Sequence, residues 1–353
     1  MMDEGEIKRV VEAWDAFFSR RLEKRPLWDG YLRYVDRLTR CELPIIFEAD
    51  HLAALVGVES RILFAHAADP QSFYRTYEIP KRRGGMRSIT VPSPSLMAVQ
   101  RWILENILNK IPLSENAHGF VKAKSVVSNA KVHLGAPVLL KMDLADFFPS
   151  ISLKRVIATF MRSGYPPNVS FLLANLCCLE GRLPQGAPTS PALSNIVAKR
   201  LDRRLQGLAD RHKLNYSRYA DDICLSGQSI DDELFLSIPS IARSEGFLIN
   251  HDKTRVAKMG QKMIICGISI SNGKLALPRA TVRHIKLTAH YVLKNGLMRH
   301  SEITGHWDPI LVERLLGKLG FWLQIDPDNR AAIELKQQLE KYDPALDFTS
   351  AIV

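Results

Sequence analysis

Cysteine is scarce in this sequence, and the few cysteines are not spaced for a shared structural task. The 353 residues contain five, an odd number, and no Cys-x-x-Cys pair occurs. Disulfide frameworks use paired cysteines and zinc sites need closely spaced Cys and His ligands, so neither is expected. The lack of paired cysteines also fits a reducing compartment. Cys177 and Cys178 are adjacent in an apolar run, which predicts core positions for both. The other three are Cys41, Cys224 and Cys266.

Long apolar runs are also missing. No stretch reaches the roughly 18 apolar residues that a membrane-spanning helix needs. Residues 1–18 are acidic and then amphipathic, unlike a secretory signal. The sequence contains no internal repeat and no low-complexity segment. These features predict a cytoplasmic protein with no membrane partner.

What the sequence has in excess is positive charge. It contains 48 Lys and Arg against 37 Asp and Glu, a formal net charge of +11. Such an excess favours a polyanionic partner, because basic side chains that neutralise phosphates release counterions. A soluble protein that is merely basic is the alternative. Charge therefore favours a nucleic acid and requires further evidence from motifs.

The hydrophobic pattern changes between helical and strand periodicity along the chain. Residues 1–70 have helical spacing, whereas residues 74–91 read as two strands joined by a basic turn at Gly84-Gly85. A helix follows, with Val99, Ile103 and Ile107 on one face. This interleaving predicts an α+β core flanked by helical regions. Further strands are predicted at 137–144, 214–227, 246–257 and 263–277, and further helices at 192–211 and from 279 onward, one of them starting at Asp326-Pro327.

Three carboxylates occupy predicted strand ends. Asp143 closes an apolar strand, and Asp221-Asp222 form a hairpin tip 78 residues later. Carboxylates on adjacent strands can bridge two hard divalent ions, as two-metal phosphoryl transfer requires. The alternative is a turn without chemistry, since Asp-Asp pairs are common in turns. Asp231-Asp232 has that simpler interpretation, as a helix start.

The surrounding motifs resemble those of reverse transcriptases. Tyr219-Ala220-Asp221-Asp222 has the family's YxDD pattern, and KMDLADFFPSI (141–151) is similar to the strand with the first catalytic aspartate. Six motifs, in the family's order, cover about 74–278. The resemblance implies a right-hand polymerase with fingers, a palm of antiparallel sheet plus helices, and a helical thumb. The remaining four are IPKRRGGMRSITVPS (79–93), LPQGAPTSPALSN (183–195), GFLINHDKT (246–254) and the turn at Cys266-Gly267.

The resemblance also implies roles for individual residues. Asp143, Asp221 and Asp222, with the carbonyl of Leu144, would hold two Mg²⁺ ions, for which Mn²⁺ can substitute. Lys253 matches a palm lysine of undefined role. Nucleotide binding is implied for Lys81 and Arg87 in the fingers, Phe148 as a steric gate beneath the sugar, Gln185 beside the incoming nucleotide, and Gly186, where the backbone approaches the substrate; Cys266 and Gly267 match the primer grip.

Among these enzymes the chain resembles the bacterial retron reverse transcriptases. SNAKVHLGA (128–136) contains Asn129 and His133 of their NAxxH motif, for which RNA binding is expected, with a hydrogen-bonded turn histidine as the alternative. Ile265-Cys266-Gly267 departs from their usual Val-Thr-Gly. The implied organisation is an N-terminal helical region (1–70), catalytic fingers and palm (71–278) and a thumb (279–353).

The resemblance implies partners and a product. A structured non-coding RNA would serve as template and primer, with deoxynucleotides as substrates. The product would be a small DNA joined to RNA through an internal guanosine 2′-hydroxyl, partly an RNA–DNA hybrid. A host RNase H would remove template RNA, and an effector protein would act with the enzyme in anti-phage defence. The alternatives are another domain-poor reverse transcriptase, of intron or abortive-infection type, or a nucleic-acid-binding scaffold for an effector.

Overall fold

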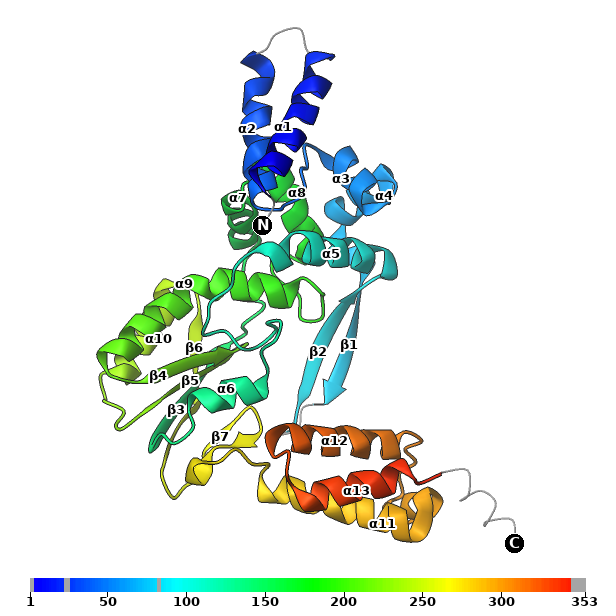
Figure 1. Cartoon of the computed structure of the whole chain (residues 1–353), viewed down its shortest axis with the longest axis vertical. Helices are drawn as coiled ribbons and strands as arrows, with labels where there is room; N and C mark the ends of the chain where they lie inside the picture. Colours follow the sequence, from blue (N-terminus) through cyan, green and yellow to red (C-terminus); the bar gives the residue numbers. More distant parts are fainter. Residues whose placement is uncertain (1–2, 22–25, 81–83, 344–353) are drawn as a thin grey trace.

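A computed structural model describes residues 3–21, 26–80 and 84–343. Its N-terminal part is helical, as the sequence predicts. Asp3 caps the first helix, because its side chain accepts a hydrogen bond from the backbone of Glu6. The first two helices form a hairpin at one end of the molecule (Figure 1). The four helices are α1 (Glu4–Ser19), α2 (Pro26–Arg40), α3 (Ala49–Val56) and α4 (Ser60–Ala68).

A long hairpin extends from the helical part, as predicted for residues 74–91. After the short helix η1 (Pro70–Phe73), strands β1 (Tyr74–Pro80) and β2 (Met86–Pro92) pair antiparallel. Both strands are largely exposed, so backbone pairing rather than core packing defines their length. In Figure 1 the hairpin reaches toward the C-terminal helices.

The central sheet has four antiparallel strands in the order β4-β5-β3-β6. Its side chains alternate between two faces, as the strand period requires. Leu140 and Met142 of β3 and Leu225 of β5 belong to the main core, together with α9 and α10. Leu139 and Cys224, one residue out of phase, belong to a second core. The strands are β3 (Val138–Ala145), β4 (Asn215–Tyr219), β5 (Asp222–Gly227) and β6 (Leu248–Lys258), and the covering helices are α9 (Ser190–Arg211) and α10 (Leu234–Ser244).

Smaller elements complete both sides of the sheet. The strands predicted within 263–277 are present as two short strands, followed by the turn η3 (Ser271–Gly273). Those strands lie beside α6, and Val127 and Ala130 of α6 join the second core. The remaining elements are α5 (Pro94–Asn106), η2 (Leu108–Lys110), α6 (Val126–Val132), α7 (Leu153–Arg162), α8 (Pro167–Cys177), β7 (Ile264–Ile265) and β8 (Ile268–Ser269).

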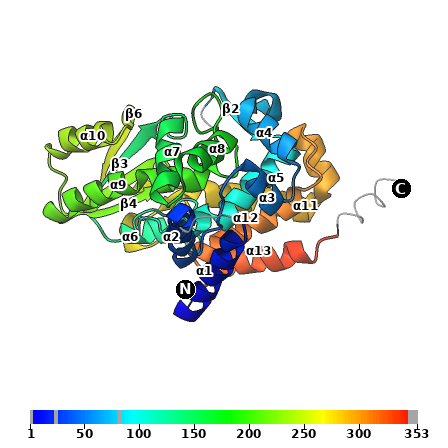
Figure 2. The same ribbon diagram turned by 90° about the horizontal axis from the view of Figure 1, so that it is seen from above.

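Three helices form the C-terminal part: α11 (Arg279–Thr304), α12 (Leu311–Ile325) and α13 (Arg330–Glu340). The predicted helix start at Asp326-Pro327 is wrong by three residues, because the Asn329 side chain caps α13 by accepting from the backbone of Ala332. Figures 1 and 2 place α10 and α11 on opposite sides of the molecule. No helix within the described ranges is long and apolar enough to span a membrane.

Candidate active site

The sheet brings the three predicted carboxylates together. Asp143 and Asp222 are directly opposite each other in the register of β3 and β5. Asp221 precedes β5 in the turn, and its backbone carbonyl accepts a hydrogen bond of 2.9 Å from the Leu144 amide. Asp143 is 7% exposed, and the other two carboxylates are partly buried. Residues 78 apart in sequence therefore form one acidic group at a sheet end.

A buried arginine fixes the turn between β4 and β5. Arg218 is fully buried, and its guanidinium forms a two-pronged ion pair with Asp202 of α9, both contacts at 2.7 Å. The same guanidinium donates 3.0 Å hydrogen bonds to the Ala220 carbonyl and the Asn195 side chain. Ala220 has φ of 55°, a left-handed conformation that is costly outside glycine. The ion pair thus holds the backbone directly before the two aspartates.

A segment that sequence reasoning did not assign to the site packs under this turn. Asn195 donates 2.8 Å to the Gly119 carbonyl. A Cβ on Gly119 would lie 2.6 Å from the Ala220 nitrogen, so only glycine fits there. The next residue, Phe120, is 49% exposed and has its ring 6.2 Å from that of Phe148. The only sequence signal was the short AHGF string at 117–120, which predicts nothing by itself.

The electrostatics of the site favour a bound cation. Burial, reinforced by the charges of Asp143 and Asp222, raises the pKa of Asp221 to about 6. Burial likewise raises the pKa of Asp222, which the nearby Lys141 partly offsets. The Lys253 ammonium lies 2.7 Å from a carboxylate oxygen of Asp143, and this hydrogen bond raises the lysine pKa. Negative charge therefore exceeds what Lys253 neutralises.

The donor set fits a hard divalent cation, because its side chains offer only oxygen ligands. The residues that the structure describes contain no group of three His, Cys, Asp or Glu side chains converging as a metal site. A cation at this site would be held by the carboxylate oxygens of Asp143, Asp221 and Asp222.

Of the predicted nucleotide-side residues, Arg87 lies on the hairpin, and Gln185 and Gly186 contact it. Arg87 is exposed on β2, opposite Ile79, and Lys81 lies outside the described residues. The Gln185 carbonyl accepts a 2.8 Å hydrogen bond from the Thr90 amide of β2. Gly186 also abuts β2, where a Cβ would lie 2.6 Å from the Thr90 carbonyl oxygen. The close contact between residue 186 and β2 therefore requires glycine. From the sequence alone, this glycine was linked only to the approach of the substrate.

Phe148 is partly buried, and its ring packs 5.6 Å from that of Phe147. It follows the Asp143 strand by three residues and forms, with Phe120 and Tyr219, an aromatic group near the carboxylates. The arrangement is compatible with the gate that the resemblance implies. That role stays a prediction.

The predicted primer-grip residues form the tight turn between β7 and β8. Cys266 and Gly267 have φ of 46° and 85°, as a two-residue hairpin turn of type I′ requires. The Cys266 sulfur accepts a hydrogen bond of 3.6 Å from the Asn129 side chain. The turn is thereby attached to α6.

His133 and Asn129, for which RNA binding is predicted, are not at the surface of this structure, and that role stays a prediction. Both are fully buried. His133 bridges two strands, with its ring nitrogens 2.7 Å from the Ser217 hydroxyl of β4 and 2.8 Å from the Ser226 hydroxyl of β5. Burial lowers its pKa to about 3.

Comparison with known proteins agrees with this geometry. The family model described as "Reverse transcriptase (RNA-dependent DNA polymerase)" matches residues 79–285. The chain is 36% identical to the retron Ec86 reverse transcriptase of Escherichia coli, covering 86% of this chain and 93% of that protein. It is 33% identical to the retron Mx162 reverse transcriptase of Myxococcus xanthus, covering 83% of this chain and 67% of that protein.

An antiparallel sheet that presents paired aspartates, with a fingers hairpin and a helical C-terminal part, is the arrangement of a right-hand polymerase, and the family match makes it an RNA-directed DNA polymerase. The matches extend well beyond the motifs at the carboxylates. The chain belongs to the reverse transcriptase family and, within it, to the retron reverse transcriptases.

Proposed function

We propose that this enzyme copies part of one structured non-coding RNA into a small single-stranded DNA that stays joined to RNA. The observation that carries the chemistry is the acidic group of Asp143, Asp221 and Asp222 at the end of β3 and β5. Support for the RNA substrate comes from the retron relatives and from the net charge of +11.

In this proposal the three aspartates and the Leu144 carbonyl hold two Mg²⁺ ions. When bound, the ions supply activation of the primer hydroxyl and neutralisation of the leaving pyrophosphate. Arg218 and Asp202 keep the aspartates in place through the Ala220 carbonyl. Lys81 and Arg87 bind the triphosphate, Gln185 and Gly186 line the nucleotide site, and Phe148 excludes the ribose 2′-hydroxyl. Cys266 and Gly267 position the primer end.

The proposed organisation is an N-terminal helical region (1–70), fingers and palm (71–278) and a thumb (279–353). A host RNase H trims the template, and an effector protein acts with the enzyme in anti-phage defence. We propose that synthesis starts from the 2′-hydroxyl of an internal guanosine.

The experiment is co-expression of the enzyme with its neighbouring locus, followed by analysis of the bound nucleic acid. We expect a small DNA whose 5′ end is joined to RNA and is released by a debranching enzyme. Random host RNA without a covalent hybrid would refute the proposed product. An inactive enzyme that still binds one RNA would instead favour the scaffold alternative.

A further inference from the structure

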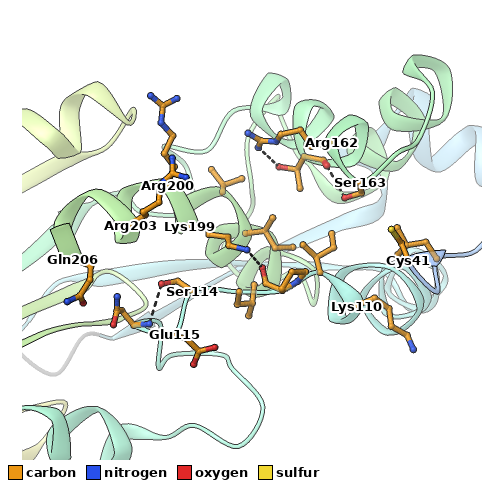
Figure 3. Close-up of a pocket in the computed structure, with 18 of the residues that line it drawn as sticks. Cys41, Lys110, Ser114, Glu115, Arg162, Ser163, Lys199, Arg200, Arg203 and Gln206 are labelled. Carbon is orange, nitrogen blue, oxygen red and sulfur yellow. Dashed lines mark hydrogen bonds between the residues drawn. The ribbon is translucent and has the colours of Figure 1, made fainter. Parts of the chain in front are cut away.

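A large groove of the described surface lies away from the carboxylates. It has a volume of about 1270 Å³ and is lined by the end of α2, the 110–116 loop, the end of α7 and one side of α9 (Figure 3). None of the proposed catalytic or nucleotide-binding residues lines it. The opposite side of α9 packs Leu201 and Leu205 into the core below the sheet. The groove and the carboxylates therefore lie on different sides of this layer.

The groove is strongly basic. Six cationic side chains line it against two acidic ones, Glu115 and Asp210. Both acids already have partners, since Glu115 pairs with Lys124 at 3.6 Å and Asp210 accepts a hydrogen bond from Gln206 at 2.6 Å. The six cations are Arg40, Lys110, Arg162, Lys199, Arg200 and Arg203.

Three of these cations are available for a ligand. Within the part of the chain that the structure describes, no carboxylate pairs with Arg162, Lys199 or Arg203. The Arg162 guanidinium donates only to the Thr159 hydroxyl, at 3.4 Å, and Lys199 donates to the Pro112 carbonyl at 2.9 Å. Lys199 and Arg203 are four residues apart on α9 and so face the same way. Figure 3 shows Arg162 on the facing helix.

The remaining lining chemistry indicates which polyanion the groove takes. Its described lining contains no aromatic side chain, so base stacking, the usual means of holding unpaired bases, is not available. The apolar part of the lining is formed by Leu43, Ile111, Pro112, Leu113, Ile196 and Val197. Ser114, Asn116, Ser163 and Gln206 supply neutral donors and acceptors beside the cations. Such a mixture suits phosphates and ribose 2′-hydroxyls of a folded RNA, which are recognised by shape rather than by base sequence.

We propose that this groove binds the phosphodiester backbone of a folded RNA segment that is not being copied. The inference rests on the proposed function, because it assigns a second anchoring site for the same structured RNA. The Asn116 carbonyl of the 110–116 loop accepts a hydrogen bond from the backbone amide of Arg218. The loop that lines the groove is therefore attached to β4, the strand that precedes the aspartates. RNA in the groove stays bound while its copied part moves through the active site.

A cysteine in the groove allows RNA binding there to be measured chemically. Cys41 lines it and is exposed, whereas the other four cysteines are buried or partly buried. The probe is a synthetic RNA with two stem-loops, and the readout is the rate of Cys41 alkylation by iodoacetamide, measured by peptide mass spectrometry. We expect saturating RNA to slow alkylation of the full-length enzyme at least about tenfold and raised salt to restore it, because phosphate contacts are salt-dependent.

The test variant is Arg162→Gln with Arg203→Gln, both at exposed positions. The matched control is Lys154→Gln with Arg211→Gln, which removes the same charge from the same two helices outside the groove. The groove variant should bind the RNA about tenfold more weakly, with a log–log salt slope shallower by about two. The control should keep both the affinity and the protection of Cys41.

Equal losses in the two variants, or RNA that binds without protecting Cys41, would overturn the proposal, as would protection only by acidic proteins. Extension of oligo(dT) on poly(A), a substrate without folded RNA, tests polymerase activity separately from RNA binding in the groove. The groove variant should extend it at the wild-type rate. Failure of the wild-type enzyme there would refute polymerase function and leave the binding result standing.

Discussion

Phe148 provides a single-residue test of substrate choice. Its ring lies beside Phe120 and follows the Asp143 strand by three residues. A bulky ring beneath the sugar would reject a 2′-hydroxyl by steric exclusion. We therefore expect Phe148→Ala to increase ribonucleotide incorporation relative to deoxynucleotides, measured as the ratio of the two kcat/KM values. An unchanged ratio would show that Phe148 only packs against Phe147.

His133 makes stability depend on pH. Its pKa of about 3 lies below the value of about 6.5 in an unfolded chain, so the unfolded state binds the proton first as pH falls. Its contribution to stability is therefore complete above pH 6.5 and is lost toward pH 3, with a slope approaching 1.4 kcal/mol per pH unit.

Urea unfolding between pH 7 and pH 4.5 measures this. His133→Gln should be less stable at pH 7 and should show a shallower pH dependence. Some dependence will remain, because burial also lowers the pKa of His118 to about 4. Parallel pH profiles for the variant and the wild type would contradict the buried, neutral histidine.

Arg218 is the residue on which the turn geometry depends most. Removing one partner of a buried ion pair leaves an uncompensated charge and typically costs about 3–5 kcal/mol. Arg218→Met should lower the free energy of unfolding by that amount. Arg211→Met, at an exposed position at the end of α9, should change it by less than about 0.5 kcal/mol. The double variant Arg218→Met/Asp202→Leu should lose less than the sum of the singles. Additive losses would show that the pair is not a unit.

At the residue scale, the sequence did not predict the buried contacts of Arg218 and His133. The sequence made no prediction for Arg218, because only the packing of β4 against α9 buries it beside Asp202. His133 was expected to bind RNA because it lies in the NAxxH motif. Its serine partners lie 84 and 93 residues away, and no local pattern connects them. The aspartates were predictable because ordered motifs identified them.

At the element scale, periodicity predicted the main helices and strands and failed where local capping decides. In 263–277 the predicted strands form, but each is only two residues long and a turn follows them. The start of α13 was misplaced because Asn329, not Asp326, accepts the capping hydrogen bond. The helix α9 was predictable from its long apolar stripe.

The 117–120 segment packs against the turn before the aspartates, and adding one methyl group to Gly119 tests whether this packing matters. Gly119→Ala would place a Cβ 2.6 Å from the Ala220 nitrogen, although the Gly119 backbone itself does not require glycine. The turn must move, and a displacement near 1 Å can cost about 10²-fold in rate. We expect kcat on oligo(dT)·poly(A) to fall by that order with the circular dichroism spectrum unchanged.

Gly207→Ala is the control for this substitution. Gly207 lies in α9, and a methyl group added to it would meet nothing within 4 Å. Alanine also favours a helix over glycine by about 1 kcal/mol. This variant should keep wild-type kcat and be slightly more stable. Equal kcat for wild type and Gly119→Ala would show that the segment does not constrain the turn.

At the scale of the whole molecule, the chain separates its acidic and basic features. The aspartates gather at one sheet end, while the net charge of +11 is partly concentrated in a groove behind α9. The charge alone predicted a polyanionic partner, but it could not predict the groove, because α2, α7 and α9 meet only in the folded chain. One surface can hold folded RNA while another performs the chemistry.

The most direct test of the account is primer extension with Mg²⁺ on oligo(dT)·poly(A) by three single variants. Loss of a carboxylate from the acidic group should reduce the rate by about 10²–10³-fold or more in Asp143→Asn and Asp221→Asn, with unfolding curves that remain cooperative. Asp231→Asn, from the other Asp-Asp pair, should extend at the wild-type rate. Near-wild-type extension by the Asp143 or Asp221 variant would contradict the assignment of this site.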